Sequence, residues 1–191
     1  LLGLGQAQAE VHFSEIGRGL DCSLDPCEDV FPGARDFREV DEQPWVEALD
    51  EAGTPIGWLA LSTDVVSIKG YSGKPLATLI GLDKEGRITG ARVIHHSEPI
   101  LLVGIPEAAL TNWVNTYRGR HAEDKLIVGG TADEPHSVDI ISGATVTVLA
   151  ENRTIMETVV AVGEVTGVVP IRPRTPGHFV DDEQRWSWQQ L

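Results

Sequence analysis

Positive charge is scarce in this sequence, and long apolar runs are absent from it. Lys and Arg number 15 against 29 Asp and Glu, which gives a formal net charge of −14 at pH 7. A chain with so few cations displaces few counterions from phosphates, so it is not expected to bind nucleic acid or an anionic membrane surface. No stretch reaches the roughly 18 consecutive apolar residues of a transmembrane helix, so no membrane span is predicted within this sequence.

Cysteine is also scarce, since Cys22 and Cys27 are the only two among the 191 residues. No second pair completes a four-sulfur zinc site, and a mixed site that used His12 would still lack one ligand. In an exported protein the better interpretation is a disulfide between the two cysteines, which would close a short loop. Free buried thiols are the alternative.

The two ends of the chain carry signals about its compartment. Residues 1–9 read LLGLGQAQA, which resembles the remnant of an export signal with a cleavage site of the A-x-A kind. Residues 169–191 form a proline-rich tail with Trp186 and Trp188 beside Arg185, a composition typical of a chain approaching a membrane interface. We therefore predict an exported domain whose tail leads toward a membrane helix outside this chain. The alternatives are a frayed first segment and a tail that docks on its own domain.

The remaining composition, with 41% hydrophobic residues, can build the core of one domain. β-forming stretches occupy residues 45–49, 56–61, 76–82 and 87–95, with shorter ones at 125–129 and 137–141. Asp83 to Gly86 reads as the turn of a hairpin over residues 76–95. We predict an α+β fold, an antiparallel sheet of hairpins with two main helices. The expected divisions are an export remnant over 1–9, an irregular segment over 10–40, the folded domain over 41–168 and the tail over 169–191.

Two amphipathic patterns predict the main helices. In the first, over residues 105–118, Pro106 is expected at the first helical position, and an apolar stripe recurs at Leu110, Trp113, Val114 and Tyr117. The second runs over about 144–163. Its expected buried side is Val148, Leu149, Ile155, Met156, Val159, Val160 and Val162, while Glu151, Asn152 and Arg153 are expected to face water.

The start of the second helix is the most informative part of the sequence. The segment of interest is Asp139-Ile-Ile-Ser142-Gly143-Ala144-Thr145. In this segment a predicted strand ends, small residues form a turn, and a helix begins. Ser142 is a good candidate for the N-cap, which would put Thr145 at the third helical position, near unpaired amides. A phosphate could bind there without a lysine, and the small Gly143 and Ala144 would let it approach the backbone. An ordinary capped helix is the alternative.

The same string resembles the flavinylation motif D-x-x-S/T-G-A-T, in which FMN is attached through its phosphate to the last threonine. Domains with this motif occur in sodium-pumping NADH:quinone oxidoreductases, in Rnf electron-transport complexes and in NosR proteins. Gly70-Tyr71-Ser72-Gly73-Lys74-Pro75-Leu76 and His95-His96-Ser97-Glu98-Pro99 resemble the NosR branch in particular. Gly104-Ile105-Pro106-Glu107 and Val30-Phe31-Pro32-Gly33-Ala34 fit the same branch. The resemblance covers about residues 28–166.

The resemblance implies a periplasmic, covalently flavinylated electron-transfer domain rather than a self-contained enzyme. An ApbE-type flavin transferase would place FMN on Thr145, and Asp139 and Ser142 would be read by that transferase. The expected partners are nitrous oxide reductase or its maturation factors, and the rest of a membrane-embedded chain whose helices and iron–sulfur cysteines are not in this sequence. The implied location is the periplasmic face of the inner membrane, in support of denitrification.

Further candidates for cofactor contact surround this motif. The flavin ring is expected over the 76–94 hairpin and the 95–101 loop, tuned there by polarity and hydrogen bonding. Tyr71 could stack on the ring, although core packing is favoured, and Glu98 could contact a flavin edge or cap its loop. Metal binding by the adjacent His95 and His96 is disfavoured, because neighbours on a strand point to opposite faces. The cofactor-binding candidates are Thr145, Ala144, Gly143, Ser142, Asp139, Tyr71, Gly73, Lys74, His96, Glu98 and Leu101.

Two alternatives from other classes stay open at this point. One is a sensory or scaffold module without redox function, which would bind the assembly machinery of nitrous oxide reductase. The other is a hydrolase that uses Ser142. The context disfavours the hydrolase, because Ile141 replaces the first glycine of G-x-S-x-G and no base is assigned.

Overall fold

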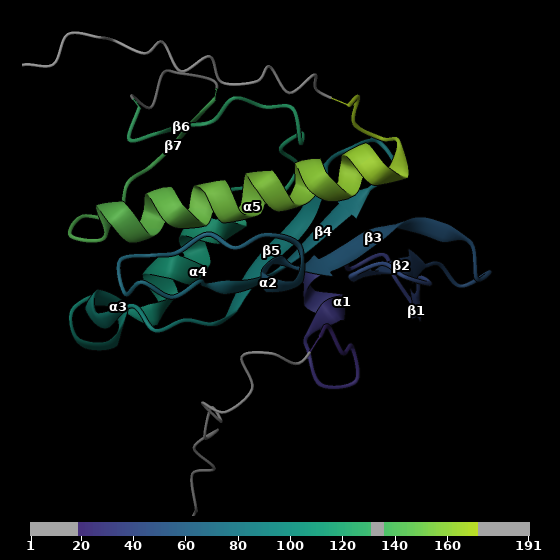
Figure 1. Cartoon of the computed structure of the whole chain (residues 1–191), viewed down its shortest axis with the longest axis horizontal. Helices are drawn as coiled ribbons and strands as arrows, with labels where there is room; N and C mark the ends of the chain where they lie inside the picture. Colours follow the sequence, from purple (N-terminus) through teal and green to yellow (C-terminus); the bar gives the residue numbers. More distant parts are fainter. Residues whose placement is uncertain (1–18, 131–135, 172–191) are drawn as a thin grey trace, which may run out of the picture.

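The computed structural model describes residues 19–130 and 136–171. The export remnant expected over 1–9 and the tryptophan-bearing end of the tail lie outside these residues. Figure 1 shows one long helix lying across a twisted sheet. The helices are α1 (Cys27–Val30), α2 (Ser62–Val65), α3 (Pro99–Val103), α4 (Glu107–Asn115) and α5 (Thr145–Thr166). The strands are β1 (Asp36–Glu39), β2 (Trp45–Leu49), β3 (Pro55–Leu61), β4 (Ala77–Asp83), β5 (Ile88–His95), β6 (Ile127–Val128) and β7 (Ser137–Val138).

Five of the strands form one antiparallel sheet in the order β1-β2-β3-β4-β5, and each pairs with the next along the chain. This arrangement confirms the predicted α+β fold with an antiparallel sheet of hairpins. The expected hairpin over 76–95 is formed by β4 and β5, and Gly86 in its turn has a φ of 77°. The short strands β6 and β7 pair in parallel as a separate ribbon.

The N-terminal part of the described chain is more regular than its composition suggested. The expectation of an irregular segment over 10–40 is wrong for α1 and β1, which lie within it. β1 is short and mostly exposed, so it lacks the apolar alternation that marks a strand, and it forms because β2 offers it a free edge. The predicted disulfide is present, since the sulfur atoms of Cys22 and Cys27 lie 2.07 Å apart.

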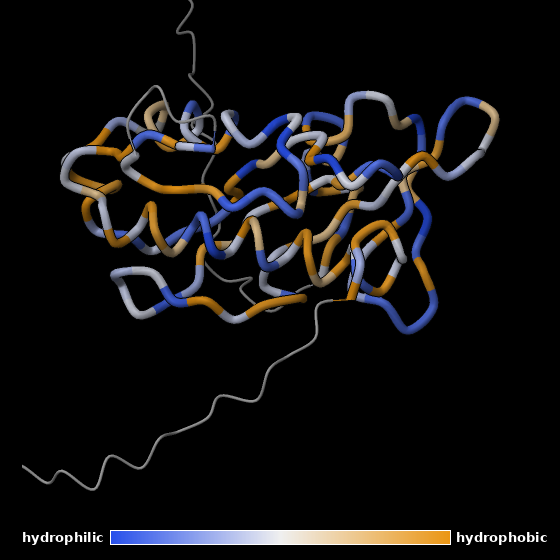
Figure 2. The backbone as a smooth tube through the Cα atoms, turned by 90° about the horizontal axis from the view of Figure 1, so that it is seen from above, coloured by the Kyte–Doolittle hydropathy of each residue, from blue (hydrophilic) through white to orange (hydrophobic). Residues whose placement is uncertain are grey.

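The sheet has a core on each face because its central strands alternate between them. Ile80 and Leu82 of β4 contribute to a cluster with α4 and α5, while Leu79 contributes to a cluster with α1 and Phe31. Figure 2 shows apolar stretches running through the middle of the molecule, with hydrophilic loops at its margins. No helix in the described residues is long and apolar enough to span a membrane.

The predicted helices exist, with changes at their ends. α4 begins at Glu107, so Pro106 is the N-cap residue with an extended ψ of 137°, and not the first helical residue as expected. All four residues of its expected stripe, Leu110, Trp113, Val114 and Tyr117, are buried. α5 continues to Thr166 and ends on Gly167, whose φ of 81° is left-handed.

The buried side of α5 differs most clearly from the expected one at two positions. Glu151, expected to face water, is 0% exposed, whereas Leu149, expected in the core, is 46% exposed. Glu151 lies inside because Thr78 on β4 donates a hydrogen bond from its hydroxyl to a carboxylate oxygen, at 2.6 Å. A carboxylate in a helical pattern is normally expected at the surface. The hydrogen-bond donor that allows Glu151 to be buried, Thr78, lies 73 residues away in the chain, so the local pattern could not indicate it.

Candidate functional site

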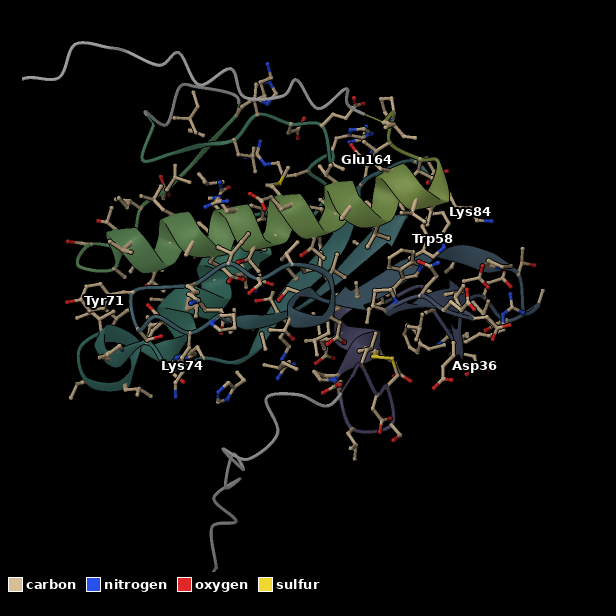
Figure 3. All side chains as sticks on the ribbon, in the orientation of Figure 1. Asp36, Trp58, Tyr71, Lys74, Lys84 and Glu164 are labelled. Carbon is tan, nitrogen blue, oxygen red and sulfur yellow. A yellow bond between two sulfur atoms is a disulfide. The ribbon has the colours of Figure 1, made fainter. Side chains whose placement is uncertain are left out.

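A surface cavity of about 500 Å³ opens where α5 begins, a size typical of small-molecule sites. Three segments form its walls: the loop before β4, helix α3 and the first turn of α5. Figure 3 places Tyr71 at this end of the molecule and Asp36 at the opposite end. The lining residues are Tyr71, Pro99, Ile100, Val103, Gly143, Ala144, Thr145, Val146 and Thr147.

The first turn of α5 presents Thr145 to this cavity. The chain reaches the helix through Gly143, whose φ of 85° favours glycine, and Ala144 occupies the N-cap position. Thr145 is therefore the first helical residue and its side chain is exposed. The prediction of a Ser142 cap with Thr145 in third position is wrong, and no side chain caps the helix. The tight turn closed by the Ala144 amide on the Ile141 carbonyl, at 2.9 Å, delays the helix by two residues.

The amides at this helix end favour an anion. The first amides of any α-helix lack an intrahelical carbonyl partner, and the helix dipole gives this end a partial positive charge. The earliest backbone bond into the helix is donated by the Val148 amide to the Ala144 carbonyl, at 2.9 Å. The amides of residues 145–147 precede it, beside the Thr145 hydroxyl. This end of α5 can therefore hold a phosphate or a phosphodiester without a basic side chain.

The segment before the helix is fixed by a contact from α4. The Trp113 indole nitrogen donates to the Asp139 carbonyl at 2.6 Å, which ties β7 and the following turn to the core. The side chains of Asp139 and Ser142 are exposed and lie outside the cavity lining. The two residues expected to be read by a transferase are thus open to solvent near Thr145.

The loop over residues 70–74 forms a second wall. It is closed by a hydrogen bond from the Gly70 amide to the Lys74 carbonyl, at 2.9 Å, and Gly73 supplies a φ of 77°. Tyr71 is 69% exposed and lines the cavity, so the preference for core packing is wrong. Gly73 and Lys74 are exposed and lie outside the lining, although Lys74 is at the same end of the molecule (Figure 3).

Glu98 lies behind the cavity wall and is 0% exposed. Its carboxylate accepts hydrogen bonds from the amides of Tyr71 at 3.1 Å and Ser72 at 3.0 Å, and from the Thr147 hydroxyl. Burial acts to raise the pKa of Glu98, but these hydrogen bonds outweigh it and hold the pKa below its ordinary value. The group is therefore ionised at neutral pH, held by neutral donors.

Two other candidates support this wall from behind. His96 is half-buried, and its Nδ1 lies 3.3 Å from the Glu98 amide, which donates to it. Leu101, on α3, is 7% exposed and belongs to the hydrophobic core. Neither residue lines the cavity.

The structure brings together four of the candidates at the cavity, namely Tyr71, Gly143, Ala144 and Thr145. Two further lining residues, Pro99 and Ile100, fall in the 95–101 loop expected beside the ring but were not singled out, and sequence reasoning missed the lining residues Val103, Val146 and Thr147. Pro99 at the first position of α3 was a usable signal, because proline is favoured where a helix begins. The expected 95–101 loop is partly this helix, whose residues Ile100 and Val103 turn toward the cavity.

The site suits a ligand that combines an aromatic ring system with one anionic group. The lining side chains are apolar or hydroxylic and none is charged, whereas the amides at the start of α5 suit an anion. FMN has this chemistry, and Thr145 offers the only exposed hydroxyl of the first turn. Within residues 19–130 and 136–171, no group of three His, Cys, Asp or Glu could hold a metal ion.

Comparison with known proteins relates the chain to flavin domains. Residues 70–160 match the family model described as FMN-binding domain. The chain is 32% identical over 167 residues to the regulatory protein NosR of Pseudomonas aeruginosa, a match that covers 85% of this chain and 23% of NosR. It is 33% identical over 92 residues to one component of the ion-translocating oxidoreductase complex of Stutzerimonas stutzeri, covering 48% of this chain and 40% of that protein.

One solved structure is also similar. NqrC of Shewanella oneidensis superimposes with a TM-score of 0.45 at 20% sequence identity, over 73% of this chain and 72% of that one. The chain spans less than a quarter of the length of the NosR protein it matches.

Proposed function

The chain carries an FMN-binding domain over residues 70–160 that is related to NosR, and on this premise we propose that it holds FMN covalently on Thr145 and transfers electrons. The observation that carries the proposal is the position of Thr145. Its exposed hydroxyl lies on the cavity at the first helical position of α5, beside amides that have no intrahelical partner.

The attachment reaction follows from the chemistry of a hydroxyl beside an anion site. The Thr145 oxygen forms a bond to the phosphorus of the FMN half of FAD, and the phosphoanhydride bond to that phosphorus breaks. AMP leaves with the electron pair of the broken bond, and the hydroxyl proton passes to solvent. An ApbE-type transferase would supply the catalytic groups, with exposed Asp139 and Ser142 as parts of its recognition surface.

The cavity suits an electron carrier better than a catalyst of substrate turnover. Bound FMN supplies reversible one- or two-electron chemistry, and the protein contributes binding, orientation and polarity. The apolar residues Pro99, Ile100 and Val103 form one wall, which would exclude water from one side of the ring. A diester linkage carries one negative charge, in keeping with a site that has amides and no cationic side chain.

We further propose a biological role for this electron transfer, in support of nitrous oxide reductase. Similarity to NosR supports a periplasmic domain of a membrane-bound protein that delivers electrons in the maturation or activity of nitrous oxide reductase. Similarity to a component of an ion-translocating oxidoreductase complex supports the redox part of this role. The proposed partners are the transferase, nitrous oxide reductase or its maturation factors, and the remainder of the membrane chain.

Intact mass spectrometry tests the attachment directly. The chain is produced with an ApbE-type transferase, and its mass is expected to rise by one FMN less one water, with the label on Thr145. Thr145→Val should abolish the label and leave folding intact, because this side chain is exposed. Thr145→Ser keeps a hydroxyl and serves as the matched control, which should retain labelling. A label on another residue, or an unlabelled chain beside an active transferase, would refute the proposal.

Absorbance spectra separate the redox function from the scaffold alternative. A redox carrier is yellow, bleaches reversibly with dithionite, and keeps its colour after acid precipitation. A scaffold would support nitrous oxide reductase equally well with Thr145→Val. Equal support by that variant would therefore contradict the electron-transfer part of the proposal.

A further inference from the structure

Glu98 is a buried carboxylate, and the hydrogen-bond donors around it in the described chain are all neutral. The donors come from two segments that are far apart in sequence, the 70–74 loop and the first turn of α5. Within the described part of the chain, no lysine or arginine forms an ion pair with it. Burying a charge is costly unless hydrogen bonds compensate, so these contacts are needed to keep the carboxylate in place.

Through these contacts Glu98 links two walls of the cavity, the 70–74 loop and the first turn of α5. Tyr71 and Thr147 both line the cavity, and both donate to the same oxygen, Oε2, of Glu98. The loop also approaches the carboxylate closely, because a Cβ added at Gly70 would lie 2.5 Å from Oε1. A shift of either wall would break a hydrogen bond to a buried charge.

Thr147 and Thr145 face different sides of the helix. Two residues correspond to about 200° of rotation in an α-helix, which has about 3.6 residues per turn. Thr147 is 1% exposed and directed inward, while Thr145 is exposed on the cavity. Fixing the Thr147 hydroxyl on Glu98 therefore fixes the rotation of the first turn, and with it the direction of the Thr145 hydroxyl.

We propose that Glu98 is a positioning residue for attachment of the flavin: through Thr147 it holds the first turn of α5 against the Tyr71–Ser72 loop, and this presents Thr145 to the transferase. The inference rests on the proposed flavinylation of Thr145. Glu98 itself does not line the cavity, so it acts without touching the cofactor. This role differs from both roles that the sequence left open for Glu98, a contact with a flavin edge and a cap for its own loop.

A pair of substitutions at Thr147 separates the hydrogen bond from the packing. Thr147→Val keeps the volume and removes the hydroxyl, whereas Thr147→Ser removes a methyl group and keeps the hydroxyl. The rate of labelling by purified transferase and FAD is measured for each intact chain. Loss of a hydrogen bond to a charged group changes an equilibrium by at least about tenfold, so the Val variant should be labelled at least about tenfold more slowly than the Ser variant.

Thr158→Val is the control for a buried threonine on the same helix. Thr158 is 1% exposed, and its hydroxyl donates to the Thr154 carbonyl at 2.7 Å, away from the cavity. This variant removes an equivalent hydroxyl and should label at the rate of the unmodified chain. Melting temperatures of all variants show whether each one is folded at the assay temperature.

The kinetic pattern distinguishes positioning from partial unfolding. A misdirected Thr145 lowers kcat for label transfer, whereas a smaller folded fraction raises the apparent KM for the chain. A decrease in kcat for Thr147→Val, with the Ser variant close to the unmodified chain, supports the inference. Equal labelling of the Val and Ser variants overturns it, and so does a loss confined to KM. Because the unmodified chain must be labelled in either case, these outcomes are distinct from failure of flavinylation itself.

Discussion

Glu151 gives the domain a stability that should decrease as the pH rises. Its side chain is 0% exposed, and within the described chain its Oε2 atom has no hydrogen-bond partner. Burial raises the pKa of Glu151 from 4.5 to about 7, and the hydrogen bond from Thr78 offsets only part of this increase. The folded protein therefore holds a proton on Glu151 at pH values where the unfolded chain has lost it.

The sign and size of the effect follow from this difference. Between about pH 4.5 and 7 the native state binds one proton more than the unfolded state, so the free energy of unfolding falls as the pH rises. At about 1.4 kcal/mol per pH unit, this pKa difference corresponds to about 3 kcal/mol. The stabilisation from the neutral carboxyl is complete below pH 4.5 and is lost as the pH passes through 7.

Glu151→Gln removes the titration and keeps the shape. A glutamine amide resembles the protonated carboxyl, so the variant and the unmodified chain should have similar unfolding free energies at pH 5. At pH 8 the variant should be more stable by about 3 kcal/mol. Urea unfolding followed by circular dichroism at pH 5, 6, 7 and 8 measures both values. The difference between the two chains should grow from pH 5 to pH 7 and level off toward pH 8, where Glu151 is ionised in both states.

Glu157→Gln is the matched control on the same helix. Glu157 is exposed and pairs with Arg153 at 2.8 Å, so its substitution should change stability by less than about 1 kcal/mol. That change should be the same at pH 5 and pH 8. The reasoning is refuted if the difference between Glu151→Gln and the unmodified chain is constant with pH, or if the unmodified chain gains relative stability at pH 8.

Two further predictions concern the face of the sheet that lies opposite to α5 and contacts α1 and Phe31. Reduction of the Cys22–Cys27 disulfide should lower the free energy of unfolding by about 2 kcal/mol, which is the loop-closure contribution of so short a ring. Urea unfolding with and without reductant measures this loss, and an unchanged unfolding midpoint would contradict it. Gly57→Ala should cost about 2 kcal/mol or more, because the new Cβ would lie 2.3 Å from the Leu82 carbonyl and 2.7 Å from the Phe31 ring. Gly33→Ala, whose Cβ meets only a side-chain atom at 3.6 Å, is the control, and an equal loss in both variants would contradict the steric explanation.

Local sequence signals were sufficient for much of the fold. The density of apolar β-forming residues and the turn at Gly86 predicted the β4–β5 hairpin, because both act within a few residues of chain. The small residues of the motif likewise indicated a turn followed by a helix. The N-cap was misplaced because the position of a helix start depends on the turn before it, and the Ala144–Ile141 hydrogen bond decides that turn.

The candidate site could be predicted in part. Thr145 and its small neighbours were identifiable because a string of adjacent residues carries the motif. The opposite wall was expected only as a loop over 95–101, and the helix α3 and its residue Val103 were not identified, because the contribution of this wall depends on where α3 packs. For Tyr71 core packing was favoured over contact with the ring, since the apolar ring of a tyrosine is often partly buried, and the structure instead leaves it exposed at the cavity.

The sequence by itself determined the antiparallel sheet, the two main helices, the disulfide partners and the threonine at which the motif ends, because each depends on neighbouring residues or on simple periodicity. Only the tertiary structure decided that Glu98 joins two walls of a cavity and that Glu151 is buried against Thr78. The donors to these carboxylates lie between 26 and 73 residues away in the chain, and packing of the sheet against α5 brings them within hydrogen-bond distance. Whether a carboxylate is solvated, ionised or protonated depends on such partners, which no local pattern specifies.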